Sequence, residues 1–122
     1  MTALLVVVGA AIGAPLRYLT DLLVQSRHDT VFPWGTLTVN AAGSLILGAV
    51  AGTVSAGAPV WLLTLVGTGF CGALTTFSTF GFETLRLVEE GSVVEAVLNA
   101  GVSLLIGLVG CAGGWVLAAS LA

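Results

Sequence analysis

A hydroxyl-rich stretch near the middle of the chain holds the residues best suited to chemistry. Four hydroxyl side chains fall within positions 75–79, and Gly67, Gly69 and Gly72 precede them. Hydroxyls donate hydrogen bonds to anions, and carbonyls released from a broken helix coordinate cations. Because glycine and β-branched threonine both lower helix propensity, the stretch predicts a helix break near 72–78. The residues favour an ion site there over a kinked helix whose hydroxyls bond back to their own turn.

Other polar residues stand alone in apolar surroundings. Asn40 lies within the apolar segment 37–47, where its amide is costly unless it is hydrogen-bonded. Taken alone, it favours a hydrogen bond between helices over a donor role in a conduction path. Arg17 lies near the end of the first apolar run, either as a functional charge or as a side chain that reaches the membrane surface. Glu83 follows the hydroxyl stretch, and an ion pair with Arg86, three residues later, is the simpler interpretation of this carboxylate beside a functional one.

Nothing in the sequence predicts an enzyme. Asn99 and Ser103 are four residues apart and share one helix face, which is a polar stripe of low specificity. Cys71 and Cys111 lie far apart in apolar segments, which favours packing roles over a disulfide or a metal site. The single histidine, His28, falls in a polar stretch, and zinc-type ligand spacings are absent from the sequence.

The elements that must position these residues are membrane helices. Hydrophobic residues make up 57% of the 122 positions and charged residues only 7%, whereas soluble domains carry about 25% charged residues. No charged residue occurs over 30–82 or from 96 to the end. About 20 apolar residues span a bilayer. The sequence therefore predicts an all-α integral membrane protein with one domain over 1–122 and spans at 3–24, 33–54, 60–88 and 94–117.

Glycine spacing and arginine placement bear on assembly and topology. Glycines four apart, such as Gly48 and Gly52, let membrane helices approach closely, within one subunit or between subunits. Arg27 and Arg86 fall in the first and third loops, with Arg17 near the same side, and the chain has no lysine. The positive-inside rule places those loops in the cytoplasm, but so small a bias also fits insertion in both orientations. Without a basic patch, nucleic acid is not an expected partner.

Three segments of the chain together resemble one family. They read GAAIGAPLRY at 9–18, PWGTLTVNAAGS at 33–44 and GFCGALTTFSTF at 69–80, the last followed by Glu83. This combination resembles the Fluc/CrcB fluoride channels. The resemblance implies an antiparallel, dual-topology homodimer of four-helix subunits in the plasma membrane of a bacterium, which exports fluoride passively. A pair of paralogous chains, each with a fixed orientation, is the other assembly that such families use.

The resemblance also implies roles for individual residues. Asn40 would be a pore-lining donor, and Phe77 and Phe80 would turn their rings toward the fluoride path. Arg17 would lie at the aqueous vestibule and Glu83 near the other end of the pathway. Phenylalanine edges carry partial positive charge, which suits an anion in a dry constriction.

A polar track and a sodium ion complete the implied channel. Gly72 and Thr75 would give backbone carbonyls to a structural sodium ion at the dimer centre. Asn99 departs from the family, which usually has tyrosine at that position. The hydroxyls implied in or beside the track are those of Thr76, Ser78, Thr79 and Ser103.

Two other classes compete with the channel. Small multidrug-type exporters are also dual-topology dimers of about this length, but they need a membrane-embedded carboxylate in the first span. Here the first acid is Asp21, near the end of that span. A structural subunit without transport would not require the costly hydroxyl-rich break in the third span.

Overall fold

The chain folds into four antiparallel helical spans. A computed structural model describes residues 1–27 and 32–121, and this part is entirely helical apart from short connections. Four helical segments are long and apolar enough to cross a membrane, as the sequence predicts, and three of them end within two residues of the predicted bounds. The last span extends four residues beyond its predicted end. The observed spans are α1 (Thr2–Ser26), α2 (Trp34–Ser55), the interrupted third span (Val60–Glu89) and α6 (Val93–Leu121).

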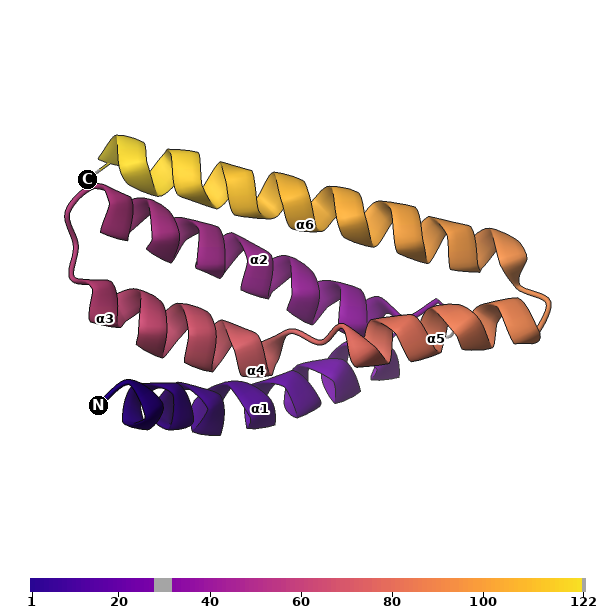
Figure 1. Ribbon diagram of the computed structural model, residues 1–122. Coiled ribbons are helices and arrows are strands. Elements are labelled where there is room, and N and C mark those ends of the chain that lie inside the picture. The colour runs from indigo at the N-terminus through magenta and orange to yellow at the C-terminus, as the bar shows by residue number, and fades with distance from the viewer. Residues whose placement is uncertain (28–31, 122) are drawn as a thin grey trace.

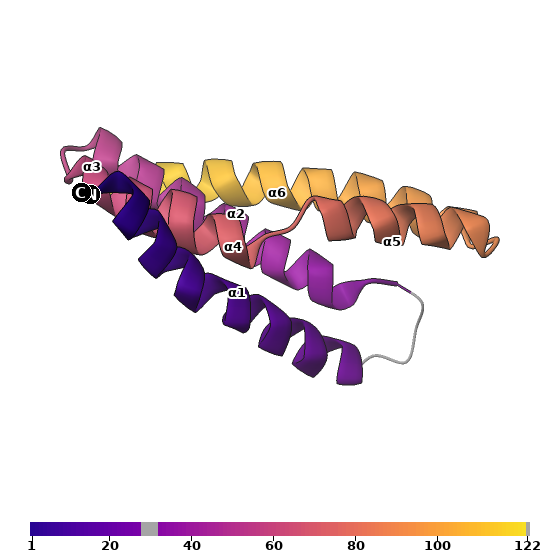
Figure 2. The same cartoon turned by 60° about the horizontal axis from the view of Figure 1, so that its bottom comes forward.

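Figures 1 and 2 show how these spans lie together. The two termini lie at one end of the bundle, and each span runs opposite to the one before it (Figure 1). α2 packs along α6, whereas α1 packs along the first half of the third span. In the second view the C-terminal half of α1 runs away from α5 and α6 but stays beside the start of α2, where the Gly35 N–H donates to Gln25 Oε1 at 3.0 Å (Figure 2). The position of His28 lies outside the described residues.

Proline and glycine mark the helix ends. Pro33 and Pro59 stand immediately before α2 and α3, where a missing N–H costs no helical hydrogen bond. Gly57 and Gly91 follow the ends of α2 and the third span with φ of 116° and 84°. In the second of these turns Ser92 N–H donates to the carbonyl of Leu87 at 2.8 Å, closing a Schellman motif. These tight turns set neighbouring spans antiparallel.

The third span contains four pieces of helix and one true break. α3 (Val60–Leu62) leads into a π-helical segment, η1 (Leu63–Cys71), followed by α4 (Gly72–Leu74). The backbone then leaves the helical conformation over residues 75–77, and α5 (Ser78–Glu89) completes the span. The break lies inside the predicted range but is narrower, because the helix continues through Leu74. The π-helical turns are not predicted by the sequence pattern.

Glycines allow the backbones of neighbouring helices to touch within one subunit. A methyl group added at Gly48 would collide with the carbonyl oxygen of Cys111, and one at Gly52 would collide with that of Trp115. Gly9 packs in the same way against the carbonyl of Leu65. The spacing of small residues therefore serves packing of α2 on α6 and of α1 on η1.

Apolar side chains face outward over most of the bundle. Val97, Leu105 and Leu108 on α6 are each at least 63% exposed, whereas few large side chains among the described residues are buried, Leu87 and Val39 among them. A soluble protein of this size would hide such residues from water. Together with the four long apolar helices, this distribution identifies a multi-pass membrane protein.

Candidate ion pathway

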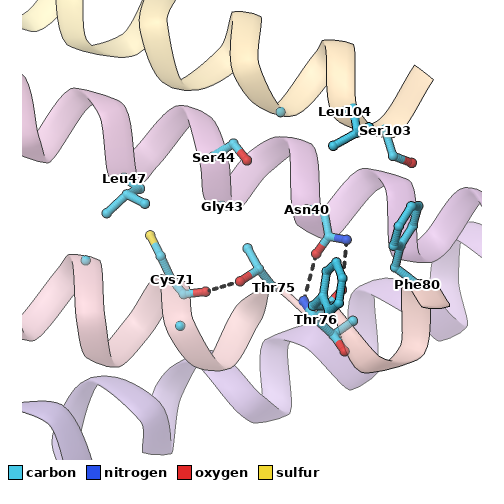
Figure 3. A pocket seen from close by; sticks show the side chains of 14 residues that line it. Asn40, Gly43, Ser44, Leu47, Cys71, Thr75, Thr76, Phe80, Ser103 and Leu104 are labelled. Atoms are coloured by element: carbon cyan, nitrogen blue, oxygen red, sulfur yellow. Dashed lines mark hydrogen bonds between the residues drawn. The ribbon is translucent and has the colours of Figure 1, made fainter. Parts of the chain in front are cut away.

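A groove of about 330 Å³ opens where α2, the broken third span and α6 meet (Figure 3). Seven of the site residues that the family resemblance implies line it, and none of the described lining residues has an acidic or basic side chain. The groove therefore combines a few polar groups with a largely apolar lining and no fixed charge in its described part. Its lining comprises Asn40, Gly43, Ser44, Leu47, Gly67, Cys71, Gly72, Thr75, Thr76, Phe77, Phe80, Ser103, Leu104 and Gly107.

Asn40 joins α2 to the break in the third span. Its Nδ2 donates to the carbonyl oxygen of Thr76 at 3.0 Å, and its Oδ1 accepts from the Thr76 N–H at 2.7 Å. Figure 3 shows this pair of bonds beside the groove. The amide thus replaces the helical partners that the backbone of Thr76 lacks, which is the interhelical role that the residue alone favours. It also lines the groove, so the two interpretations of Asn40 are compatible.

The same contacts release two backbone carbonyls. In a continuous helix the Thr76 N–H would donate to Gly72 and the Thr79 N–H to Thr75. Thr76 donates to Asn40 instead, and Thr79 N–H donates to Thr76 Oγ1 at 3.2 Å. The carbonyls of Gly72 and Thr75 therefore lose their helical donors next to the groove, as a site for a hard cation requires.

Arg17 holds a third carbonyl at the break. Its Nε donates to the main-chain oxygen of Ala73 at 3.1 Å, which ties α1 to the end of α4. Arg17 is half-buried and is absent from the groove lining. The guanidinium therefore contacts protein backbone rather than standing free at the membrane surface.

The remaining hydroxyls of the motif organise the start of α5. Thr76 Oγ1 donates to Thr79 Oγ1 at 3.0 Å and lies 3.5 Å from Ser78 Oγ. Together with the bond from Thr79 N–H, these contacts cap the new helix. Of these three residues, Thr76 alone lines the groove, so the side chains of Ser78 and Thr79 support the break from outside it.

Two phenylalanine rings line one side of the groove. The ring centroids of Phe77 and Phe80 are 6.0 Å apart with planes tilted by 42°. Both line the groove, yet Phe77 is 84% exposed in the single chain. The groove is thus open on the side where Phe77 stands.

A chain of hydrogen bonds links the groove to the interior between α6 and α5. Ser103 Oγ donates to Asn99 Oδ1 at 3.3 Å, and Asn99 Nδ2 donates to Thr84 Oγ1 at 2.7 Å. Asn99 is completely buried, while Ser103 faces the groove. Thr84 is missing from the sequence-based site, although its position four residues after Phe80 places both on one helix face.

Glu83 lies near the start of α2, away from the groove. It accepts a short hydrogen bond from the hydroxyl of Thr36, which is buried. The predicted pairing of Glu83 with Arg86 is wrong, because the ion pair of Arg86 is with Glu90, at 3.7 Å. A spacing of four residues along α5 brings those two side chains together, and the fold brings Thr36 to Glu83.

Comparison with known proteins adds the family to this geometry. Residues 4–115 match the model of the family described as "CrcB-like protein, Camphor Resistance (CrcB)". A "Fluoride-specific ion channel FluC 1" of Frankia casuarinae is 60% identical over 111 residues, 86% of each chain. A protein of the same name from Streptomyces avermitilis is 57% identical over 109 residues, 88% of each chain. The "Fluoride-specific ion channel FluC" of Shewanella amazonensis is 45% identical over 105 residues, 84% of each chain. The chain therefore belongs to the CrcB family.

Proposed function

We propose that this chain forms a fluoride-selective ion channel that lets cytoplasmic fluoride leave a bacterial cell passively. The groove carries the proposal, because it offers an amide, hydroxyls and phenyl rings beside a helix break and has no charged side chain in its described lining. The similar proteins named as fluoride-specific channels support the choice of ion.

The chemistry of the groove suits a small, strongly hydrated anion. A pore must replace the water around fluoride with donors, which the hydroxyls and the amide of the groove can supply. The ring edges of Phe77 and Phe80 add weak positive potential without a full charge. A fixed arginine or lysine among these residues would bind the anion too tightly to release it, whereas conduction requires release.

We further propose that two copies assemble antiparallel in the bacterial plasma membrane. The open side of the groove and the exposure of Phe77 support a second copy, since a single chain leaves the path unclosed. The small arginine bias of the loops supports insertion in both orientations. A paralogous chain of fixed orientation is the alternative partner, and labelling of the C-terminal end of α6 separates the two.

A sodium ion fits the carbonyls released at the break. Gly72 and Thr75 would hold it through main-chain oxygens, the donor type that hard cations prefer. When bound, the ion would supply positive charge that balances the carbonyl dipoles at the helix break. The chain's own residues keep both oxygens out of helical pairing. Asn40 accepts from the Thr76 N–H, which would otherwise donate to Gly72, and Thr76 Oγ1 accepts from the Thr79 N–H, which would otherwise donate to Thr75.

The direct test is fluoride efflux from liposomes that contain this one purified chain, with chloride as the control anion. We expect rapid fluoride efflux and little chloride efflux, because the donors of the groove suit the smaller anion. A folded, dimeric protein that passes neither ion, alone or with a co-expressed paralogue, would contradict the proposed function. Recovery of efflux only with the paralogue would instead contradict the homodimer.

Orientation is tested separately by labelling. Ser120→Cys is introduced near the exposed C-terminal end of α6, in a chain whose Cys71 and Cys111 are replaced by serine. Dual topology predicts that an impermeant maleimide labels about half of the copies in intact cells. Labelling of all copies, or of none, would show a fixed orientation.

A further inference from the structure

Seven serine and threonine hydroxyls of the described residues bond back to a carbonyl of the preceding helical turn. In each case the side chain donates to a carbonyl three or four residues earlier, at 2.7–2.9 Å. This is the usual arrangement of serine and threonine within helices. The residues that follow it are Ser26, Thr38, Thr53, Ser55, Thr75, Thr84 and Ser120.

Ser103 lies in the middle of α6 and departs from this arrangement. Its hydroxyl donates to the side-chain oxygen of Asn99 at 3.3 Å, a longer bond than the 2.7–2.9 Å of the back-bonded hydroxyls. The carbonyl that Ser103 would otherwise reach, four residues earlier, is the main-chain oxygen of Asn99 itself. The side chain of Asn99 thus diverts Ser103 from its own backbone.

Asn99 can do this because its amide is fixed from the other side. Its Nδ2 donates to Thr84 Oγ1 at 2.7 Å, and Thr84 in turn donates to the carbonyl of Phe80 at 2.8 Å. With 0% exposure, the amide is shielded from competing donors and acceptors. The chain of bonds therefore runs in one direction, from Ser103 at the groove to the backbone of α5.

We infer that Asn99 is a positioning residue that keeps the hydroxyl of Ser103 available to an anion in the groove. The inference rests on the proposed fluoride channel. Ser103 lines the groove, and its long bond to Asn99 is weaker than a back bond of ordinary length. The hydroxyl can therefore rotate to donate its hydrogen bond to an arriving anion. When the anion leaves, it rotates back and donates to Asn99 again, as conduction requires.

Removal of the Asn99 amide should return Ser103 to its own backbone. In Asn99→Leu the hydroxyl would donate to the main-chain oxygen of residue 99 with a bond of ordinary length, which an anion must break before it can bind. A neutral hydrogen bond contributes about 1 kcal/mol, equivalent to about a fivefold change in binding. We expect the half-saturating fluoride concentration of the channel to rise about fivefold.

The experiment measures fluoride current against concentration in reconstituted protein, for Asn99→Leu, Ser103→Ala and the double variant. If Asn99 acts through Ser103, each single variant raises the half-saturating concentration, and Asn99→Leu has no further effect once Ser103 is alanine. A purely structural role would lower the number of active channels at unchanged half-saturation. Unchanged half-saturation in Asn99→Leu would overturn the inference and leave the proposed function standing. An equal shift caused by Asn99→Leu with Ser103 present and with Ser103→Ala would do the same. A wild-type chain without fluoride current would overturn both.

A second variant covers the case in which Asn99→Leu fails to fold. Thr84→Val removes the anchor of the Asn99 amide and should shift half-saturation in the same direction, again only while Ser103 is present. Thr53→Val is the matched control, because Thr53 makes the same back bond, at 2.7 Å to Ala49, but accepts no bond from Asn99. Unchanged half-saturation in Thr84→Val, or an equal shift in Thr53→Val, would also refute the positioning role.

Discussion

Replacement of Asn40 by leucine gives the sharpest test of how the break is held. Leucine is branched at the same carbon as asparagine but offers neither a donor nor an acceptor. The variant therefore loses both bonds to Thr76, of 3.0 and 2.7 Å, without adding a charge. The backbone N–H and C=O of Thr76 are then left without partners at membrane depth.

The expected cost follows from those two groups. An unpaired backbone group costs about 1–3 kcal/mol when buried, and the open groove allows partial solvation, so the lower part of that range applies to each. We expect Asn40→Leu to lower the free energy of unfolding by about 2–4 kcal/mol. Asn40→Asp keeps the acceptor for the Thr76 N–H but loses the donor to the Thr76 carbonyl, which then faces a carboxylate oxygen. The loss in free energy of unfolding should therefore be roughly half that of Asn40→Leu.

The assay is unfolding in mixed micelles with increasing sodium dodecyl sulfate, followed by far-UV circular dichroism at one protein concentration. Thr38→Val is the control on the same helix, because its exposed hydroxyl bonds back to Trp34 at 2.8 Å. The control should lie within about 0.5 kcal/mol of the wild type. If Asn40→Leu matched Thr38→Val, the amide would not hold the break, and the explanation of the free carbonyls would fail with it.

Two further perturbations test the groove and the dimer. Phe80→Ile should lower fluoride efflux about tenfold, since it removes a ring from the groove together with a ring pair that contributes ~0.5–1.5 kcal/mol. Phe82→Ile, on the same helix but 65% exposed and outside the groove, should retain efflux, and equal losses would show that the rings only pack. Gly72→Ala meets no atom within 4 Å in the single chain, so a fall in the dimer fraction by size exclusion would locate a second copy there. Gly113→Ala, equally open but outside the groove, is its control, and an unchanged dimer in Gly72→Ala would refute contact at that point.

The spans and the break could be predicted because their causes are local. Long apolar runs define the helices, and the glycines and threonines of the third span lower helix propensity where the break occurs. The width of the break was not predicted correctly, because Leu74, which is buried at the end of α4, remains helical. The π-helical turns of Leu63–Cys71 have no signal in composition or spacing.

The partners within the site depend on contacts distant in sequence. Asn40 and Thr76 are 36 residues apart, and Arg17 and Ala73 are 56 apart, so neither pairing follows from a helical period. The sequence indicates that Asn40 and Arg17 are polar groups that need partners, but it does not identify those partners. The pairing predicted for Glu83 failed for the same reason, because the fold brings the hydroxyl of Thr36 on α2 to the Glu83 carboxylate.

The break at residues 75–77 also has an electrostatic consequence. The helical segment that begins at Val60 ends at Leu74 with a partial negative charge, and α5 begins at Ser78 with a partial positive charge. In an unbroken helix these partial charges would lie at the two ends of the span. Here opposite poles stand side by side in the middle of the span, where little water screens them. One short segment therefore favours a cation at one pole and an anion at the other, and an ion bound at either pole would lower the electrostatic cost of its counterpart.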